Sequence, residues 1–183
     1  MTQRLAPLLG GVFQLGYVVT DLDAALTHWI DRFGVGPWYV FKLRGAVWRC
    51  GASTTLPDLS IALSNSGDVQ VELIQQHDQA PSMYLDYLAR CPGGGLQHLG
   101  YLPADYDAAL AAAQALGFGP GQEGSFKGGR FAYLDCEAPG QTGTVIELVE
   151  PGEQTLSFFA HIRDQAAAWD GETQPVHRIG AER

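Results

Sequence analysis

The sequence carries one motif twice, at a constant spacing of 84 residues. Residues 14–26 read QLGYVVTDLDAAL and residues 98–110 read HLGYLPADYDAAL, so eight of the thirteen aligned positions are identical. Each copy has a short apolar run typical of a strand, then an Asp suited to capping a helix, then apolar residues at helical spacing. The repeat therefore predicts two strand-helix units, whose helices end at Gly34 and Gly117.

Each half of the chain also closes with a matching strand. The stretches VQVELIQ at 69–75 and TVIELVE at 144–150 align Glu72 with Glu147. Between the helix and this last strand, each half has two more segments rich in β-branched and aromatic residues. The expected fold is α+β, with two βαβββ modules. The expected boundaries are 11–80 for the first module, 81–93 for a linker helix, 94–151 for the second module, and 152–183 for a C-terminal helix and a loose polar tail.

Composition excludes several classes of partner. The formal net charge is -9 and the sequence pI is about 4.8, which argues against a basic surface for nucleic acid or anionic lipid. No apolar run approaches the roughly 20 residues that span a bilayer, so a membrane protein is not expected. Three cysteines without a CxxC pair fit a reducing compartment. These features favour a cytoplasmic protein.

Four polar residues interrupt the apolar strands at matched positions of the repeat. Residues on a strand alternate between its two faces, so Gln14 and His98 point away from the face that packs on the helix. By the same alternation, Glu72 and Glu147 point away from their apolar neighbours. All four side chains are therefore expected on one surface of the sheet, opposite the helices.

Two carboxylates in an apolar enclosure call for a common positive partner, because a buried unpaired charge is costly. No Lys or Arg occupies a matched position, whereas one divalent cation would satisfy an imidazole, an amide oxygen and two carboxylates. This predicts a metal site of Gln14, Glu72, His98 and Glu147. The alternatives are that His98 is a hydrogen-bonded core residue, that either Glu faces solvent, and that Gln14 binds only substrate.

These residues resemble the vicinal oxygen chelate superfamily over about 13–151. The segments that show the resemblance are FQLGYVVTDLDAAL, VELIQ, LQHLGYLPADYDAAL, RFAYLDC and GTVIELVEP. The closing ELVEP is similar to that of the glyoxalase I and methylmalonyl-CoA epimerase branch. The resemblance implies a cupped mixed sheet, of the glyoxalase/bleomycin resistance/dioxygenase type, with helices on the outer face. It also implies one divalent metal ion, which would be zinc, nickel, cobalt, manganese or magnesium, at the four positions named above. The superfamily often pairs or swaps modules, which leaves a homodimer open, although both halves of the cup are present in this one chain and a closed site needs no partner.

The chemistry that the resemblance implies is removal of a proton next to a carbonyl by a lyase or isomerase. Glu147 is the expected base, and Glu72 the second acid or base if the product is an epimer. Two alternatives stay open. A metal-free protein that sequesters a small molecule would keep the cup, and a ring-cleaving dioxygenase would need a His where this chain has Gln14.

Aromatic residues on the expected strands predict a cavity for an aromatic substrate or a thioester. The candidates for substrate binding are Trp38, Tyr39, Trp48, Phe131 and Tyr133. Core packing explains about half of them equally well. Five basic residues near these strands could hold an acidic group of the substrate; they are Lys42, Arg44, Arg49, Lys127 and Arg130.

Overall fold

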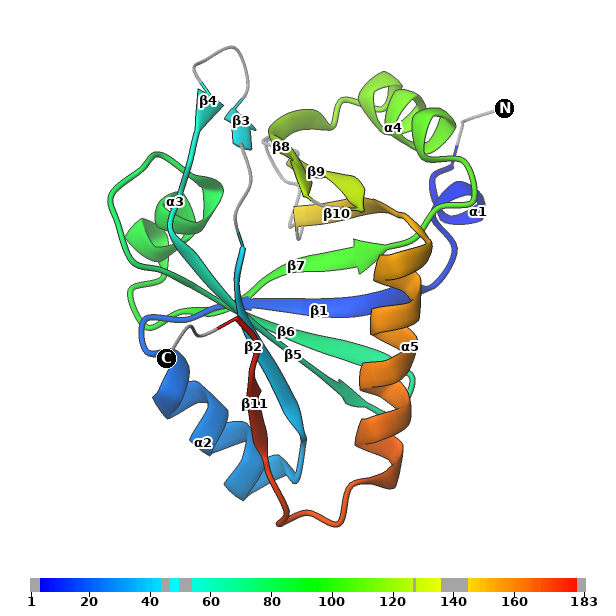
Figure 1. Cartoon of the computed structure of the whole chain (residues 1–183). Coiled ribbons are helices and arrows are strands. Elements are labelled where there is room, and N and C mark those ends of the chain that lie inside the picture. Colours follow the sequence, from blue (N-terminus) through cyan, green and yellow to red (C-terminus); the bar gives the residue numbers. More distant parts are fainter. Residues whose placement is uncertain (1–3, 44–46, 50–53, 127, 136–144, 181–183) are drawn as a thin grey trace.

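Two copies of a βαβββ unit lie side by side in one mixed sheet of the computed structural model (Figure 1). The structure describes residues 4–43, 47–49, 54–126, 128–135 and 145–180, with the backbone alone at 47–49 and 120. The first unit comprises β1 (Val12–Val18), α2 (Leu22–Phe33), β2 (Trp38–Leu43), β5 (Leu59–Ser66) and β6 (Val69–Gln76). The second comprises β7 (Gly95–Tyr101), α4 (Tyr106–Ala115), β8 (Gly119–Phe126), β9 (Gly129–Asp135) and β10 (Val145–Pro151). The remaining elements are α1 (Ala6–Leu9), β3 (Val47–Arg49), β4 (Thr54–Thr55), α3 (Met83–Arg90), α5 (Glu153–Ala168) and β11 (Val176–Arg178). The α+β fold expected from the repeat is confirmed.

The two units meet at their first strands. The strand order is β11-β2-β5-β6-β1-β7-β10-β9-β8-β3-β4. At the centre, β1 and β7 pair antiparallel, and each pairs parallel with the last strand of its own unit, β6 or β10. The β1–β7 seam therefore relates the two units by an approximate two-fold. The short β3–β4 hairpin follows β2 in the chain but pairs with β8 of the other unit (Figure 1).

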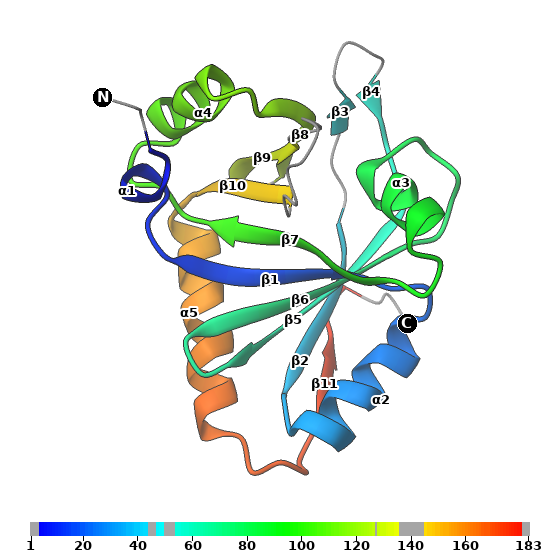
Figure 2. The same cartoon turned by 180° about the vertical axis from the view of Figure 1, so that it is seen from behind.

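The repeated helices cover the outer face of the sheet, as predicted. Figure 2 shows α2 and α4 at opposite ends of the molecule, each beside its own unit. Val71 and Leu73 of β6 lie in the apolar cluster under α2, and Leu148 of β10 lies in the cluster under α4. Among the described residues, no helix is both long and apolar enough to span a bilayer.

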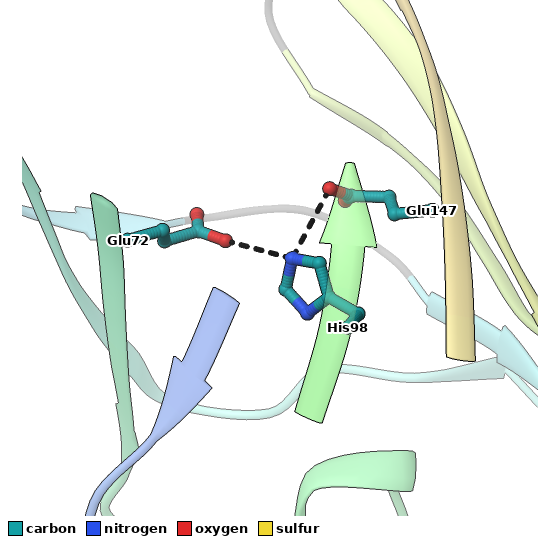
Figure 3. A group of neighbouring side chains, drawn as sticks. All are labelled: Glu72, His98 and Glu147. Carbon is teal, nitrogen blue, oxygen red and sulfur yellow. Dashed lines mark ion pairs between the residues drawn. The ribbon is translucent and has the colours of Figure 1, made fainter. Parts of the chain in front are cut away.

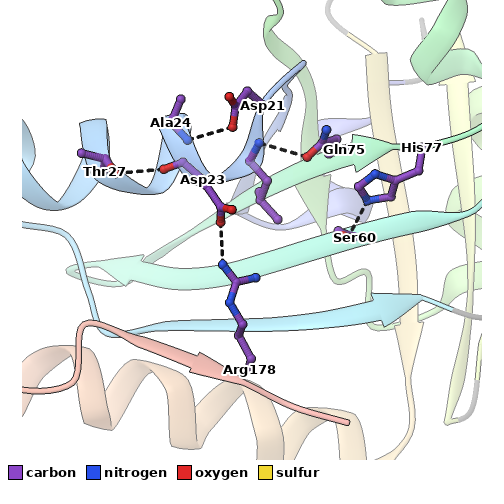
Figure 4. Close-up of polar contacts among 9 residues, drawn as sticks. Asp21, Asp23, Ala24, Thr27, Ser60, Gln75, His77 and Arg178 are labelled. Carbon is purple, nitrogen blue, oxygen red and sulfur yellow. Dashed lines mark hydrogen bonds and ion pairs between the residues drawn. The ribbon is translucent and has the colours of Figure 1, made fainter. Parts of the chain in front are cut away.

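The repeated Asp residues cap these helices. Asp21 accepts a hydrogen bond from the Ala24 amide at 3.0 Å, and Asp105 accepts one from the Ala108 amide at 2.9 Å. Side-chain oxygens at this position satisfy amides that have no partner within the helix. At the start of α2, the side chain of Gln75 also accepts a hydrogen bond from Leu22, which ties the helix to β6 (Figure 4).

The C-terminal helix α5 takes a position that the sequence did not predict. It packs on the concave face of the sheet, where Ile162 is fully buried among side chains of β5, β9 and β10. Two of the helices, α2 and α4, are thus outside the cup, and α5 covers part of its inside. Figure 1 shows α5 running along one side of the sheet from the end of β10.

The polar tail after α5 was expected to be loose, and this was wrong for residues 170–180. Strand β11 pairs parallel with β2 at the edge of the sheet. The Trp169 indole donates a hydrogen bond to the Thr173 carbonyl at 2.8 Å and packs over Gly36, while Arg178 binds Asp23 of α2 (Figure 4). An edge strand needs no apolar pattern of its own when the neighbouring strand supplies the pairing partners.

A shift in the register of β1 changes the face of the sheet on which Phe13 lies. Strict alternation puts Phe13 on the helix side with Tyr17. However, the pairing with β7 is irregular between Val12 and Gln14, and Phe13 packs within the concave face, with its ring 6.0 Å from that of Phe159. Such an irregularity turns a side chain to the other face of a strand.

Candidate metal centre

Three of the predicted ligands meet inside the cup. Glu72 of β6, His98 of β7 and Glu147 of β10 point toward one another (Figure 3), and their ligand atoms all lie within 4.8 Å of one another. The Nε2 atom of His98 is 3.3 Å from Oε2 of Glu72 and 3.3 Å from Oε2 of Glu147. His98 is fully buried, and the two carboxylates are nearly so. The sheet therefore brings one imidazole and two acids to one point.

The site is built from two neighbouring rungs of the sheet. In the first rung, Gly16 of β1 lies between Glu72 and His98, and in the second, Gly100 of β7 lies between Gln14 and Glu147. The approximate two-fold exchanges these rungs. It superposes Glu72 on Glu147 and Gln14 on His98, as the sequence repeat indicates.

The two glycines make room for the polar side chains. A Cβ atom at position 16 would overlap the imidazole of His98, and one at position 100 would lie 2.9 Å from Oε1 of Gln14. A methyl group is therefore excluded at both positions, because atoms cannot approach so closely without a shift of the neighbour. The glycine of each strand thus accommodates the polar side chain of the other strand.

Two glutamines, Gln70 and Gln97, contact the side chains of Gln14 and His98 and fix their orientation. The Gln14 amide donates from Nε2 to Oε1 of Gln70 at 2.8 Å, which leaves Oε1 of Gln14 free. The Nδ1 atom of His98 is 2.7 Å from Oε1 of Gln97. Because that oxygen can only accept, Nδ1 carries a proton and Nε2 is left to face the acids. Such partners fix the orientation of metal ligands in proteins.

The donor set fits a divalent cation. Gln14 Oε1, Glu72 Oε2 and His98 Nε2 are buried and have no hydrogen-bond partner. Leaving a buried polar atom unpaired costs about 1–3 kcal/mol, more for a charged group. One cation would satisfy all of them together with Glu147, and a mixed set of nitrogen and oxygen donors suits Zn, Mn, Co, Ni or Mg.

The electrostatics of the metal-free cluster follow from the same geometry. Burial opposes a charge on His98, but the nearby Glu147 and Glu72 outweigh it and raise its pKa to about 9. Burial also raises the pKa of Glu72, and the charge of Glu147 adds to that effect, while His98 opposes it. A proton on His98 therefore holds the two acids together where a cation would otherwise bind.

A cavity of about 400 Å³ opens from the metal centre. Gln14, Glu72 and Glu147 lie in its wall. The other residues of the wall are mostly aromatic or aliphatic: Phe13, Phe41, Lys42, Leu43, Ile61, Leu63, Tyr84, Phe126, Phe131, Tyr133, Val149, Thr155, Phe158 and Phe159. The volume suits a small organic molecule.

The five residues expected to bind substrate are found in different places. Phe131 and Tyr133 line the cavity. Trp38 does not, because it lies in the core cluster under α2, where its indole donates to the Val35 carbonyl at 2.8 Å. Strand alternation separates it from Tyr39, whose ring lies on the concave side but packs against α5 behind the cavity wall. The side chain of Trp48 lies outside the described residues.

The basic residues are engaged elsewhere or outside the described part. Lys42 forms an ion pair with Asp58 at 2.8 Å, and Arg130 binds Asp107 and Glu150. Arg44 and Lys127 lie outside the described residues, as does the side chain of Arg49. Among the described residues, the cavity wall thus offers one basic group, and that group already has an acidic partner.

Three site residues were not predicted. The repeat does not indicate Gln70 or Gln97, because neither residue recurs at the matched position of the other half. Strand alternation does place Gln70 on the same strand face as Glu72. Tyr84 comes from the linker helix α3, and its hydroxyl donates to that of Tyr133 at 3.1 Å. The pairing between distant elements leaves no local signal in the sequence.

Comparison with known proteins agrees with this architecture. Residues 13–133 match the family model of the glyoxalase/bleomycin resistance protein/dioxygenase superfamily. The chain therefore belongs to this superfamily. No curated protein matches it.

Solved structures share the fold. Methylmalonyl-CoA epimerase from Mycobacterium tuberculosis is similar with a TM-score of 0.54 and 21% identity, over 82% of this chain and 93% of that one. A hypothetical protein from Bacillus halodurans C-125 is similar with a TM-score of 0.54 and 16% identity, over 79% of this chain and 96% of that one.

Proposed function

We propose that this protein is a metal-dependent lyase or isomerase, of glyoxalase or epimerase type, that removes a proton next to a carbonyl group. The observation that carries the proposal is the arrangement of Glu72 and Glu147. The two acids flank His98 at the end of a cavity, at positions related by the approximate two-fold. The fold shared with an epimerase supports the same reading.

Gln14, Glu72, His98 and Glu147 would hold the cation. When bound, the cation acts as a Lewis acid that stabilises negative charge on the substrate oxygen. Other residues of the chain orient the ligands and form the surroundings of the two acids. Gln70 and Gln97 keep Gln14 and His98 in orientation, and the wall around the acids is mostly apolar.

Glu147 is our candidate for the base. Its side chain lines the cavity, and its neighbour on β9 is Tyr133, which lines the same wall. Glu72 faces the cavity from the other side of His98. An epimerisation requires one group to take a proton from the substrate and another to return it on the opposite face; Glu72 and Glu147 would fill these two roles when the reacting carbon lies between them.

Exchange of a carbon-bound proton tests the proposal. The probe is S-ethyl 2-phenylpropanethioate, a thioester with a single α-proton, incubated in D₂O with protein loaded with Co²⁺ and followed by NMR. We expect exchange that stops after treatment with EDTA and returns on adding Co²⁺. If Co²⁺ binds without involving His98 and Glu147, the metal site is wrong. If it binds at the site and neither this thioester nor the matching ketone and aldehyde exchange, the isomerase proposal is wrong.

Ligand binding and O₂ consumption separate the other candidates. A protein that sequesters ligands would bind the thioester unchanged and show no metal dependence. A dioxygenase would consume O₂ with a catechol in the presence of Fe²⁺, which we do not expect with Gln14 in place of a second His. Association of two chains and a cytoplasmic location stay predictions, and the mass in solution measures the first.

A further inference from the structure

The C-terminal helix supplies one wall of the cavity. Thr155, Phe158 and Phe159 of α5 line it, and we refer to these three residues as the roof. They lie beyond residue 133, where the match to the superfamily model ends. The closing strand β10 lies beyond it as well, so the matched region covers neither β10 nor the roof.

Contacts on both sides fix the roof in place. Phe159 packs on Phe13 of β1 with the ring centroids 6.0 Å apart, and Phe158 packs on Phe41 of β2 at 6.1 Å. Behind them, Ile162 is fully buried, and the side chain of His161 lies 3.1 Å from the hydroxyl of Tyr39. Helix α5 is therefore anchored to the sheet, and its two Phe rings face a preformed space.

The cavity wall is polar at the metal end and mostly apolar elsewhere. Charged and amide groups gather at the metal end, in Gln14, Glu72 and Glu147. Away from that end, the described wall is aromatic or aliphatic except for the hydroxyls of Tyr84, Tyr133 and Thr155 and for Lys42, which is paired with Asp58. Such a wall favours an uncharged hydrophobic group, because burying an unpaired charge there is costly.

We propose that the roof selects the substrate class, and that the substrate carries an uncharged aromatic or branched aliphatic group which packs between α5 and the sheet. This rests on the proposed function, since it places the reacting carbonyl at the metal end. Phe158 and Phe159 are then the specificity-determining residues. A charged carrier group, such as the phosphates of a coenzyme, finds no free cation in the described wall and stays outside the cavity.

Two ligands of the same shape test the proposal. 2-Acetylnaphthalene is neutral, and 2-naphthoate is a near copy that carries a carboxylate. Equilibrium dialysis with the full chain after treatment with EDTA measures both dissociation constants without any contribution from a metal or from turnover. We expect the ketone to bind at least about tenfold more tightly than the acid, because the acid meets two carboxylates and an apolar wall.

Substitutions in α5 test whether the ketone binds against the roof. Phe159→Ala removes apolar contact area and should weaken ketone binding by about tenfold, while Phe159→Leu should retain most of it. Leu156→Ala is the matched control, because Leu156 lies on the same helix, is 47% exposed and is absent from the wall. It should leave binding unchanged. Circular dichroism of each variant checks that α5 still folds.

Either of two results overturns the proposal: equal or tighter binding of 2-naphthoate, or equal binding of the ketone by folded Phe159→Ala and the parent chain. The proposed catalysis would survive both, since proton exchange at the metal centre is measured separately. Conversely, if the protein binds the ketone as expected but catalyses no proton exchange when loaded with metal, the proposed catalysis is refuted and the proposal about the roof stands.

Discussion

Gly16 lies directly opposite His98 across the β1–β7 seam, and the imidazole occupies the space that a side chain at position 16 would need. Gly100 stands in the same relationship to Gln14. The repeat therefore preserves pairs of positions, in which a glycine on one strand and a polar residue on the other depend on each other.

The first prediction concerns Gly16→Ala. The added methyl group would displace the His98 ring, so we expect the variant to lose metal affinity by at least about tenfold and stability by about 1–3 kcal/mol. Titration with Co²⁺ and urea unfolding measure the two effects. Gly11→Ala is the control, because a Cβ atom there meets nothing within 4 Å. Unchanged Co²⁺ binding by Gly16→Ala would contradict the site geometry.

The second prediction concerns the two acids. Glu147→Gln keeps an oxygen for the cation but removes the base, so proton exchange should fall by about 10²–10⁴-fold with little change in ligand binding. If the reaction is an epimerisation, Glu147→Gln and Glu72→Gln should each abolish exchange from a different enantiomer of the thioester. Separate NMR experiments on the two enantiomers measure this, with metal content determined for each variant. Full exchange activity in Glu147→Gln would remove that residue from the mechanism.

The third prediction concerns pH. In the metal-free protein the pKa of His98 is raised to about 9, so His98 carries a proton at neutral pH that the cation must displace. Metal affinity should therefore rise by about tenfold per pH unit from pH 6 to 8, with at least one proton released. Calorimetry in buffers of different ionisation enthalpy counts that proton. The His161→Gln variant, altered outside the centre, should show the same slope, and a flat profile would contradict the assignment.

The raised pKa of His98 also affects the stability of the metal-free protein, which should fall as the pH rises, whereas metal affinity should increase. Since the folded pKa of His98 lies above its ordinary value of 6.5, its protonation stabilises the protein fully below pH 6.5. That contribution is lost as the pH rises through 9. Thermal unfolding after treatment with EDTA should therefore show declining stability across this window, and protein loaded with metal should lose less.

The fourth prediction concerns the supporting glutamines. Gln70→Ala frees the amide of Gln14, and Gln97→Ala frees the ring of His98, so each should weaken metal binding by about 10–100-fold. Gln75→Ala provides the control on the same strand as Gln70, because it contacts the start of α2 through Leu22 and Thr20. It should lower stability without changing metal affinity. Equal metal binding by Gln70→Ala and Gln75→Ala would show that Gln70 does not support the site.

Local patterns predicted the parts of the structure that depend on local physics. The repeat gave α2 and α4 with their Asp caps, because capping and helical spacing are written in consecutive residues. Strand alternation also placed Glu72, His98 and Glu147 on one face. The pairing of β1 with β7 then brings the two matched halves of the site together.

Features that depend on distant contacts were missed. The irregularity that turns Phe13 inward arises in the pairing of β1 with β7. The order of residues 170–180 depends on the free edge of β2, and the position of α5 depends on the shape of the cup. Trp38 was assigned to the cavity by residue type, although its alternation with Tyr39 places it under α2.

The seam between β1 and β7 has a consequence for how such a centre can diversify. Each half of the chain supplies one acid and one variable donor, an amide in the first half and an imidazole in the second. Two identical halves would be forced to present matching donors, two amides or two imidazoles. Fusion of both halves in a single polypeptide releases that constraint, so one donor can be exchanged by mutation while its counterpart is kept.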